Sequence, residues 1–246
     1  MKTLQCLIIL CFFYTRLIGQ DEADVQVDYE IRFNDAFDRG RRDRIHSGYL
    51  IIHQNLSRYY MISDKRYEAT NEYDQRFDPD TNIQVFTDHS KGLMIAQEFS
   101  FSGKPFNLID TLYPMRWDIH NETKKIDSLI CIRATCTFRG RNYEAWFSAD
   151  IPLPFGPWKM GGLPGLIIDL KDEEENLVVR LRKISKVQNN FSLPTETRYT
   201  MAEHIAEMKK FLERVQANAR ASGSGDCVSC QTQSRFELFT WEKIPR

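Results

Sequence analysis

Apolar and polar residues alternate along most of this chain. Between Val25 and Phe33 every odd position is apolar or aromatic and every even position is polar, which is the period of a strand with one buried face. Further runs rich in β-branched and aromatic residues are bounded by Asp, Asn, Gly, Ser or Pro, and they predict a mainly β protein, an antiparallel meander curved into a sheet or half-barrel. These runs are Gly48–His53, Arg58–Ser63, Ile83–Thr87, Leu93–Phe101, Phe106–Leu112, Arg116–Ile119, Ser128–Phe138, Tyr143–Ser148, Leu166–Leu170, Leu177–Ser185 and Phe236–Trp241.

One segment, residues 200–221, has helical spacing instead. Its apolar positions are Ile205, Met208, Phe211, Leu212, Val215 and Ala219. Thr200 and Glu203 have the spacing of a capping box, which marks a helix start. We therefore expect one C-terminal amphipathic helix over about 200–221 that plugs or flanks the curved sheet. A Gly/Ser-rich hinge at 222–226 and a last strand at 235–242 follow it.

The N-terminus has the layout of a secretory signal peptide. Lys2 precedes an apolar run from Leu4 to Phe13, and small or polar residues at Gly19 and Gln20 offer a cleavage point. A bilayer span needs about 20 apolar residues, and no later segment provides them. The sequence thus predicts a signal peptide at 1–20, one β-rich domain at 21–246, no transmembrane segment after processing, and a periplasmic or secreted location.

Charge and histidine content exclude several classes of partner. The chain has 33 basic and 34 acidic residues, so it lacks the net field that attracts nucleic acid. Its five histidines show none of the close spacings of metal sites. We expect no nucleic acid, no metal and no cofactor.

Four cysteines remain after signal removal, because Cys6 and Cys11 lie within the signal peptide. An even number in an oxidising compartment predicts disulfides, whose pairing stays open. The candidates are Cys131, Cys136, Cys227 and Cys230. Cys227 and Cys230 also have the spacing of a redox motif, so a thiol oxidoreductase is an alternative to a structural role.

The segment from residue 139 to 167 is the densest in candidate chemistry. A turn at Arg139-Gly140-Arg141 leads into a strand that carries Trp146, and a loop rich in Gly and Pro follows. So many residues with special backbone angles predict one rigid loop conformation, suited to lining a ligand groove. Because the loop leads into a strand and not a helix, phosphate binding is disfavoured. We expect Asp150 to form a buried ion pair with Arg139 and Arg141.

The same segment resembles the GLPGLI family of exported proteins, found mainly in Bacteroidetes. The signature is Gly161-Gly162-Leu163-Pro164-Gly165-Leu166-Ile167, supported by Asp150-Ile151-Pro152 and Gly156-Pro157-Trp158-Lys159. Upstream, Cys131 with Ala134, the Phe138-Arg139-Gly140-Arg141 turn and Ala145-Trp146-Phe147 resemble the family as well. The resemblance implies an exported β protein and brings no established activity. The candidate ligand-binding or motif residues are Arg139, Gly140, Arg141, Trp146, Asp150, Pro152, Gly156, Trp158, Gly161, Gly162, Leu163, Pro164, Gly165, Leu166 and Ile167.

The favoured function is that of a non-enzymatic envelope protein. Abundant aromatic residues in strands and the lack of a recognisable catalytic set favour binding of an apolar or peptide-like ligand, or of an envelope protein partner. The alternatives are a secreted hydrolase with a site at Arg139, Arg141, Asp150 and Trp158, and the thiol oxidoreductase that uses Cys227 and Cys230.

Overall fold

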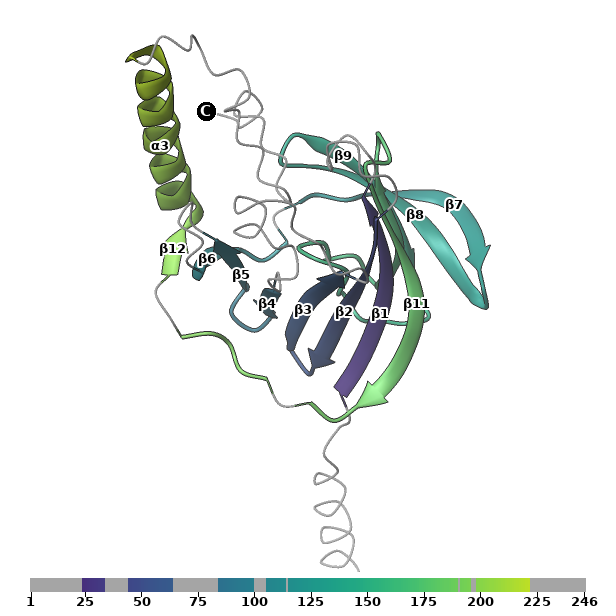
Figure 1. Cartoon of the computed structure of the whole chain (residues 1–246). Helices are drawn as coiled ribbons and strands as arrows, with labels where there is room; N and C mark the ends of the chain where they lie inside the picture. The colour runs from purple at the N-terminus through teal and green to yellow at the C-terminus, as the bar shows by residue number, and fades with distance from the viewer. Residues whose placement is uncertain are drawn as a thin grey trace, which may run out of the picture.

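A single curved sheet with one helix forms the described part of the chain (Figure 1). The computed structural model describes residues 24–33, 44–63, 84–99, 105–113, 115–189, 191–195 and 198–221. The expected signal peptide, the hinge at 222–226, the strand at 235–242, Cys227 and Cys230 lie outside these residues.

Twelve strands form the sheet, and the expected mainly β fold is confirmed. The sheet order is β12-β6-β5-β4-β3-β2-β1-β11-β10-β9-β8-β7, so two antiparallel meanders meet where β1 pairs with β11. The strands are β1 (Asp24–Phe33), β2 (Arg44–His53), β3 (Leu56–Ser63), β4 (Gln84–Asp88), β5 (Leu93–Phe99), β6 (Pro105–Thr111), β7 (Asp118–Ile126), β8 (Leu129–Phe138), β9 (Arg141–Ser148), β10 (Leu166–Asp172), β11 (Leu177–Val187) and β12 (Arg198–Thr200).

The two edge strands differ most from the expected elements. β7 extends to Ile126, well beyond the predicted end at Ile119. The prediction stopped short because the second half of this strand is polar and mostly exposed. An edge strand with little burial shows no alternation in its sequence. β12 covers only three residues and pairs parallel to β6. The sequence pattern did not predict this strand.

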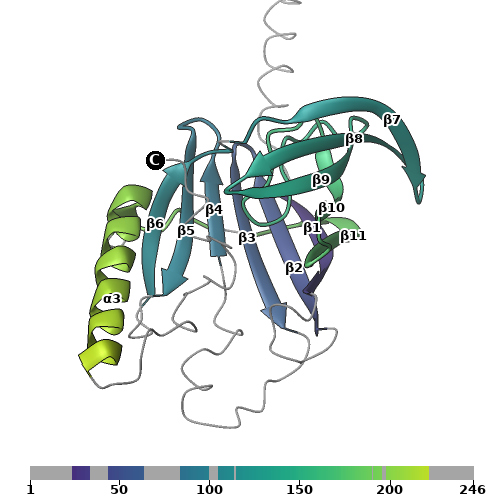
Figure 2. The same cartoon turned by 90° about the horizontal axis from the view of Figure 1, so that it is seen from above.

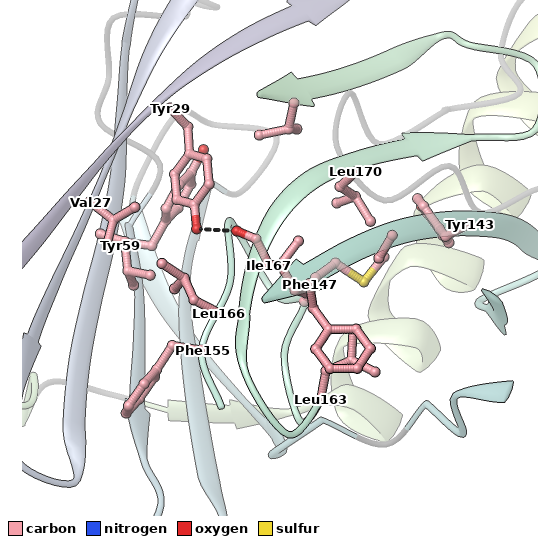
Figure 3. Close-up of a cluster of buried hydrophobic side chains, with 14 of the residues drawn as sticks. Val27, Tyr29, Tyr59, Tyr143, Phe147, Phe155, Leu163, Leu166, Ile167 and Leu170 are labelled. Carbon is pink, nitrogen blue, oxygen red and sulfur yellow. Dashed lines mark hydrogen bonds between the residues drawn. The ribbon is translucent and has the colours of Figure 1, made fainter. Parts of the chain in front are cut away.

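The concave face of the sheet holds the hydrophobic core. Val27, Tyr29 and Ile31 of β1 are almost fully buried there, as are Leu166 and Ile167 of β10 (Figure 3). The long connection between β9 and β10, residues 149–165, adds Phe155, Met160 and Leu163 to this core. The Gly-rich loop and the concave face therefore form one packed unit.

The helix α3 (Met201–Ala221) flanks the sheet at the β6 edge (Figure 2). Phe106 of β6 packs against Tyr199 and His204, with ring centroids 5.4 and 5.3 Å apart. The predicted capping box is present: the Thr200 amide donates to Glu203 Oε2 at 2.8 Å, and the Glu203 amide donates to Thr200 Oγ1 at 3.2 Å. Among the described helices, none is both long and apolar enough to span a bilayer.

Candidate functional site

The loop between β9 and β10, residues 149–165, is tied to itself by backbone hydrogen bonds. The Met160 amide donates to the Pro157 carbonyl at 3.1 Å, and the Gly162 amide donates to the Pro154 carbonyl at 3.0 Å. At the start of β10, the Leu166 amide donates to the Ile151 carbonyl at 2.9 Å. These bonds satisfy backbone groups that a buried loop would otherwise leave unpaired.

Glycines in this loop permit close packing. A Cβ on Gly161 would overlap the ring of Tyr113, and one on Gly165 would overlap the carbonyl of Ser148. A Cβ on Gly156 would lie 2.7 Å from Ile167 Cδ1 and 2.8 Å from the Met160 carbonyl oxygen. At these three motif positions a larger residue would clash with its neighbours, so the glycines are required for packing of the loop.

Two aromatic donors outside the motif hold the loop and the start of β10. Trp117 Nε1 donates to the Gly161 carbonyl at 2.9 Å. The Tyr29 hydroxyl donates to the Ile167 carbonyl at 2.8 Å, across the core between β1 and β10 (Figure 3). Sequence reasoning did not predict either hydrogen bond, because the partners are distant along the chain.

A ring cluster forms the other support of the loop. His89, in the turn between β4 and β5, lies 4.3 Å from Phe155 and 5.3 Å from Tyr113, measured between ring centroids. Burial lowers the pKa of His89, and Asp88 opposes this effect. His89 is therefore neutral at neutral pH, and it contacts the loop as an aromatic ring.

Buried tyrosines lie beneath the loop. Burial raises the pKa of Tyr29, which Tyr59 and Tyr113 raise further, and burial also raises the pKa of Tyr59 and of Tyr113. A hydrogen bond with Thr87 lowers the pKa of Tyr113 and so partly offsets the increase caused by burial. These phenols stay protonated at neutral pH, so they act as hydrogen-bond donors and not as bases.

The turn between β8 and β9 is fixed by two ion pairs. Arg139 pairs with Asp110 of β6, and Arg141 Nη1 lies 2.8 Å from Asp172 Oδ2 of β10. The expected ion pair with Asp150 is wrong: Asp150 is exposed and follows the opposite end of β9. The four residues of the alternative hydrolase site therefore do not converge.

Trp158 connects this turn to the concave face. Its ring packs edge-on against Phe138, with centroids 6.5 Å apart. The Arg139 guanidinium lies over the Phe138 ring, 4.8 Å from its centroid. Lys159 is 1% exposed, and its ammonium lies 5.8 Å from the Trp158 ring.

A small apolar cavity of about 30 Å³ lies beside Trp158. Residues of β1, β3, β10 and β11 and of the loop between β9 and β10 line this cavity. The lining residues are Ile31, Phe33, Tyr59, Met61, Trp158, Leu170, Leu177 and Val179. Trp158 is the one candidate residue from the sequence that lines it, and the other seven belong to strands.

Trp146 belongs to the opposite face of the sheet. Its Nε1 donates to Glu144 Oε1 at 3.2 Å, and Lys124 Nζ lies 4.2 Å from its ring centroid. Arg133 binds Glu144 and Glu122 on this outer face. Pro152 and Pro164 are exposed, whereas Leu163, Leu166 and Ile167 are core residues. The motif residues thus divide between core, surface and cavity.

Cys131 and Cys136 are buried free thiols. Among the described residues neither forms a disulfide, and each is packed within β8, while the other two candidate cysteines, Cys227 and Cys230, lie outside these residues. Burial raises the pKa of Cys131, and burial raises that of Cys136 to about 12, so both are protonated and unreactive at neutral pH. Within the described ranges no three His, Cys, Asp or Glu side chains gather as metal ligands.

Solved structures of a protein called PNGF-II share this fold. In a C2 crystal form the match has 13% sequence identity and a TM-score of 0.53, covering 73% of this chain and 31% of PNGF-II. In a P21 form it has 13% identity and a TM-score of 0.51, covering 75% and 32%. No protein-family model matches the chain, and no curated protein does. The chain spans about a third of PNGF-II and is similar to it in fold.

Proposed function

We propose that this is an exported envelope protein, related to the GLPGLI family, which binds an apolar or peptide-like group without catalysis. The cavity beside Trp158 is the observation that carries this proposal. Seven of its eight lining side chains have no charged or hydroxyl group, and the eighth, Tyr59, carries a phenol that stays protonated. Such a wall favours a neutral, apolar guest.

The size of the cavity limits what it accepts. A single water needs about 10–15 Å³ of such space. The volume of about 30 Å³ therefore suits about one methyl group, such as the tip of an aliphatic side chain of a peptide or of a partner protein. The rest of that ligand would lie outside the cavity, against the rim formed by Trp158 and Phe33.

Trp158 is the rim residue best suited to recognition. It is half-buried, whereas the strand residues Ile31, Tyr59 and Val179 are almost fully buried. A Trp ring offers a large contact area at a low entropic cost. Its position on a braced loop means that little ordering is required when a guest binds.

Fluorescein-labelled pentapeptides with glycine flanks and a central Leu or Ser test this proposal by anisotropy. Burial of a Leu side chain is worth about 1.5–3 kcal/mol, so the Leu peptide should bind at least about tenfold more tightly than the Ser peptide. Trp158→Ala should abolish this preference. Trp146→Ala removes the same side chain from the outer face, and it should leave the preference intact.

Two results would contradict the proposal. One is equal binding of the Leu and Ser peptides to the unmodified protein. The other is an equal loss of preference in the Trp146 and Trp158 variants, because an effect shared by both faces would not come from the cavity. Thermal unfolding of each variant verifies that the protein used is folded.

A further inference from the structure

The ion pair between Arg139 and Asp110 joins two distant parts of the sheet. Asp110 lies on β6, the second strand from one edge, and Arg139 lies in the turn after β8, the second strand from the other edge. Their side chains are only 12% and 15% exposed, respectively. The pair therefore bridges the open side of the half-barrel from a partly buried position.

A continuous series of contacts leads from this ion pair to the cavity. The Arg139 guanidinium lies over the Phe138 ring, and Phe138 packs edge-on against Trp158. Trp158 in turn forms part of the cavity wall. Arg139 does not line the cavity itself.

The backbone at both ends of this series needs external support. Arg139 has a φ of +50°, and Trp158 has a φ of +56°. Side chains other than glycine rarely adopt such left-handed angles, and a bulky residue does so only where the surrounding contacts enforce it. The contacts that could enforce the Trp158 conformation include Phe138, which Arg139 covers.

We propose that Arg139 is a positioning residue, whose ion pair with Asp110 holds Trp158 in place as a wall of the cavity. This inference rests on the proposed function. According to this proposal, the ion pair between Arg139 and Asp110 controls how tightly the cavity binds an uncharged side chain, although neither residue contacts that side chain. Because salt screens charges that retain some solvent exposure, peptide binding should weaken with ionic strength although the peptide side chain is neutral.

Fluorine NMR on protein labelled with 5-fluorotryptophan gives a direct readout of Trp158 without any ligand. The Trp158 resonance is identified as the one that Trp158→Phe removes. Arg139→Gln and Asp110→Asn should each shift or broaden this resonance and weaken Leu-peptide binding about fivefold or more. Exchanging the charges, with Arg139→Asp and Asp110→Arg in one chain, should restore both readouts at least in part.

The matched control is Arg133→Gln. Arg133 forms comparable ion pairs with Glu144 and Glu122 on the outer face, remote from Phe138 and Trp158. This variant should leave the Trp158 resonance and the salt dependence of binding unchanged. Asp110→Asn removes the pair from the β6 side, so it provides an independent test should Arg139→Gln prevent folding.

The two proposals fail in different ways. If no peptide binds but Arg139→Gln moves the Trp158 resonance, the proposed function is wrong and the positioning role stands. If both Arg139→Gln and Asp110→Asn leave the resonance unchanged, the positioning role is overturned, whatever the peptides do. A salt dependence that persists unchanged in both variants would overturn it as well.

Discussion

Individual side chains packed against the loop at residues 149–165 have consequences for stability that can be measured. His89 is the clearest example, since its ring is enclosed by Phe155 and Tyr113 and no described group accepts or donates a hydrogen bond at its Nε2. The charged form of such a ring is disfavoured because it loses solvation.

The pH dependence follows from this burial. The pKa of His89 in the folded state lies below its value of about 6.5 in the unfolded chain, so as the pH falls the unfolded chain takes up the proton first. Stability that is present above about pH 6.5 is therefore lost below it. The urea midpoint should fall between about pH 7.5 and pH 5.5 by more in the unmodified protein than in His89→Gln. An identical fall in both proteins would show that other groups cause it.

The close packing of Gly161 against Tyr113 leads to a second prediction at the residue scale. Adding a methyl group there forces an overlap with the Tyr113 ring, and overpacking of this kind costs about 1–3 kcal/mol. Gly161→Ala should lower the free energy of unfolding by that amount in urea titrations. Combining it with Tyr113→Leu should recover part of the loss, since the smaller side chain makes room. Additive losses in the double variant would contradict this account.

At the scale of elements, helix α3 starts at a well-defined cap. The Thr200 hydroxyl accepts from the Glu203 amide, and the Glu203 carboxylate accepts from the Thr200 amide. The Thr200 hydroxyl also donates to the Glu203 carboxylate at 2.9 Å. The hydrogen bond from the Thr200 amide and the one from the Thr200 hydroxyl, in that order, lower the pKa of Glu203. Both interactions satisfy donors at the helix start.

Removing this cap should loosen the helix selectively. Thr200→Ala should cost about 1 kcal/mol of helix stability, because an N-cap hydroxyl contributes that much. Amide hydrogen exchange should become faster in the first turns of α3 and stay unchanged in β1 and β2. Thr200→Ser keeps a hydroxyl and serves as the control. Equal exchange in all three proteins would exclude a role for the cap.

The sequence predicted strands and the helix more accurately than it predicted contacts between them. β1 was predictable to within a residue because its two faces differ in burial, whereas the polar half of β7 has no such contrast. The partners of Arg139 were not predictable, since Asp150 is nearer in sequence and Asp110 is brought in only by the curvature of the sheet. Trp146 and Trp158 look equivalent in the sequence, yet strand register places Trp146 on the outer face, whereas the loop at residues 149–165 brings Trp158 to the cavity.

For the whole molecule, the two buried thiols report on global unfolding. Cys131 and Cys136 are protonated and shielded, so iodoacetamide at about pH 8 should modify them slowly in the folded protein. In concentrated urea without reductant both should react rapidly, and mass spectrometry of the peptide that contains them should follow this. Rapid native labelling would contradict the burial, and a lack of labelling in urea would show that they are oxidised.

The pairing of β1 with β11 has a consequence for the order in which the molecule can assemble. Asp24 lies opposite Val187, so the first described strand completes its pairing only with one of the last. As the chain is synthesised, β1 to β6 can form their own meander early, but β1 then remains an uncovered edge until β11 arrives. Contacts so distant in sequence make folding slow, and open edges promote aggregation. The interval between the synthesis of β6 and that of β11 is thus the period in which this protein most needs protection.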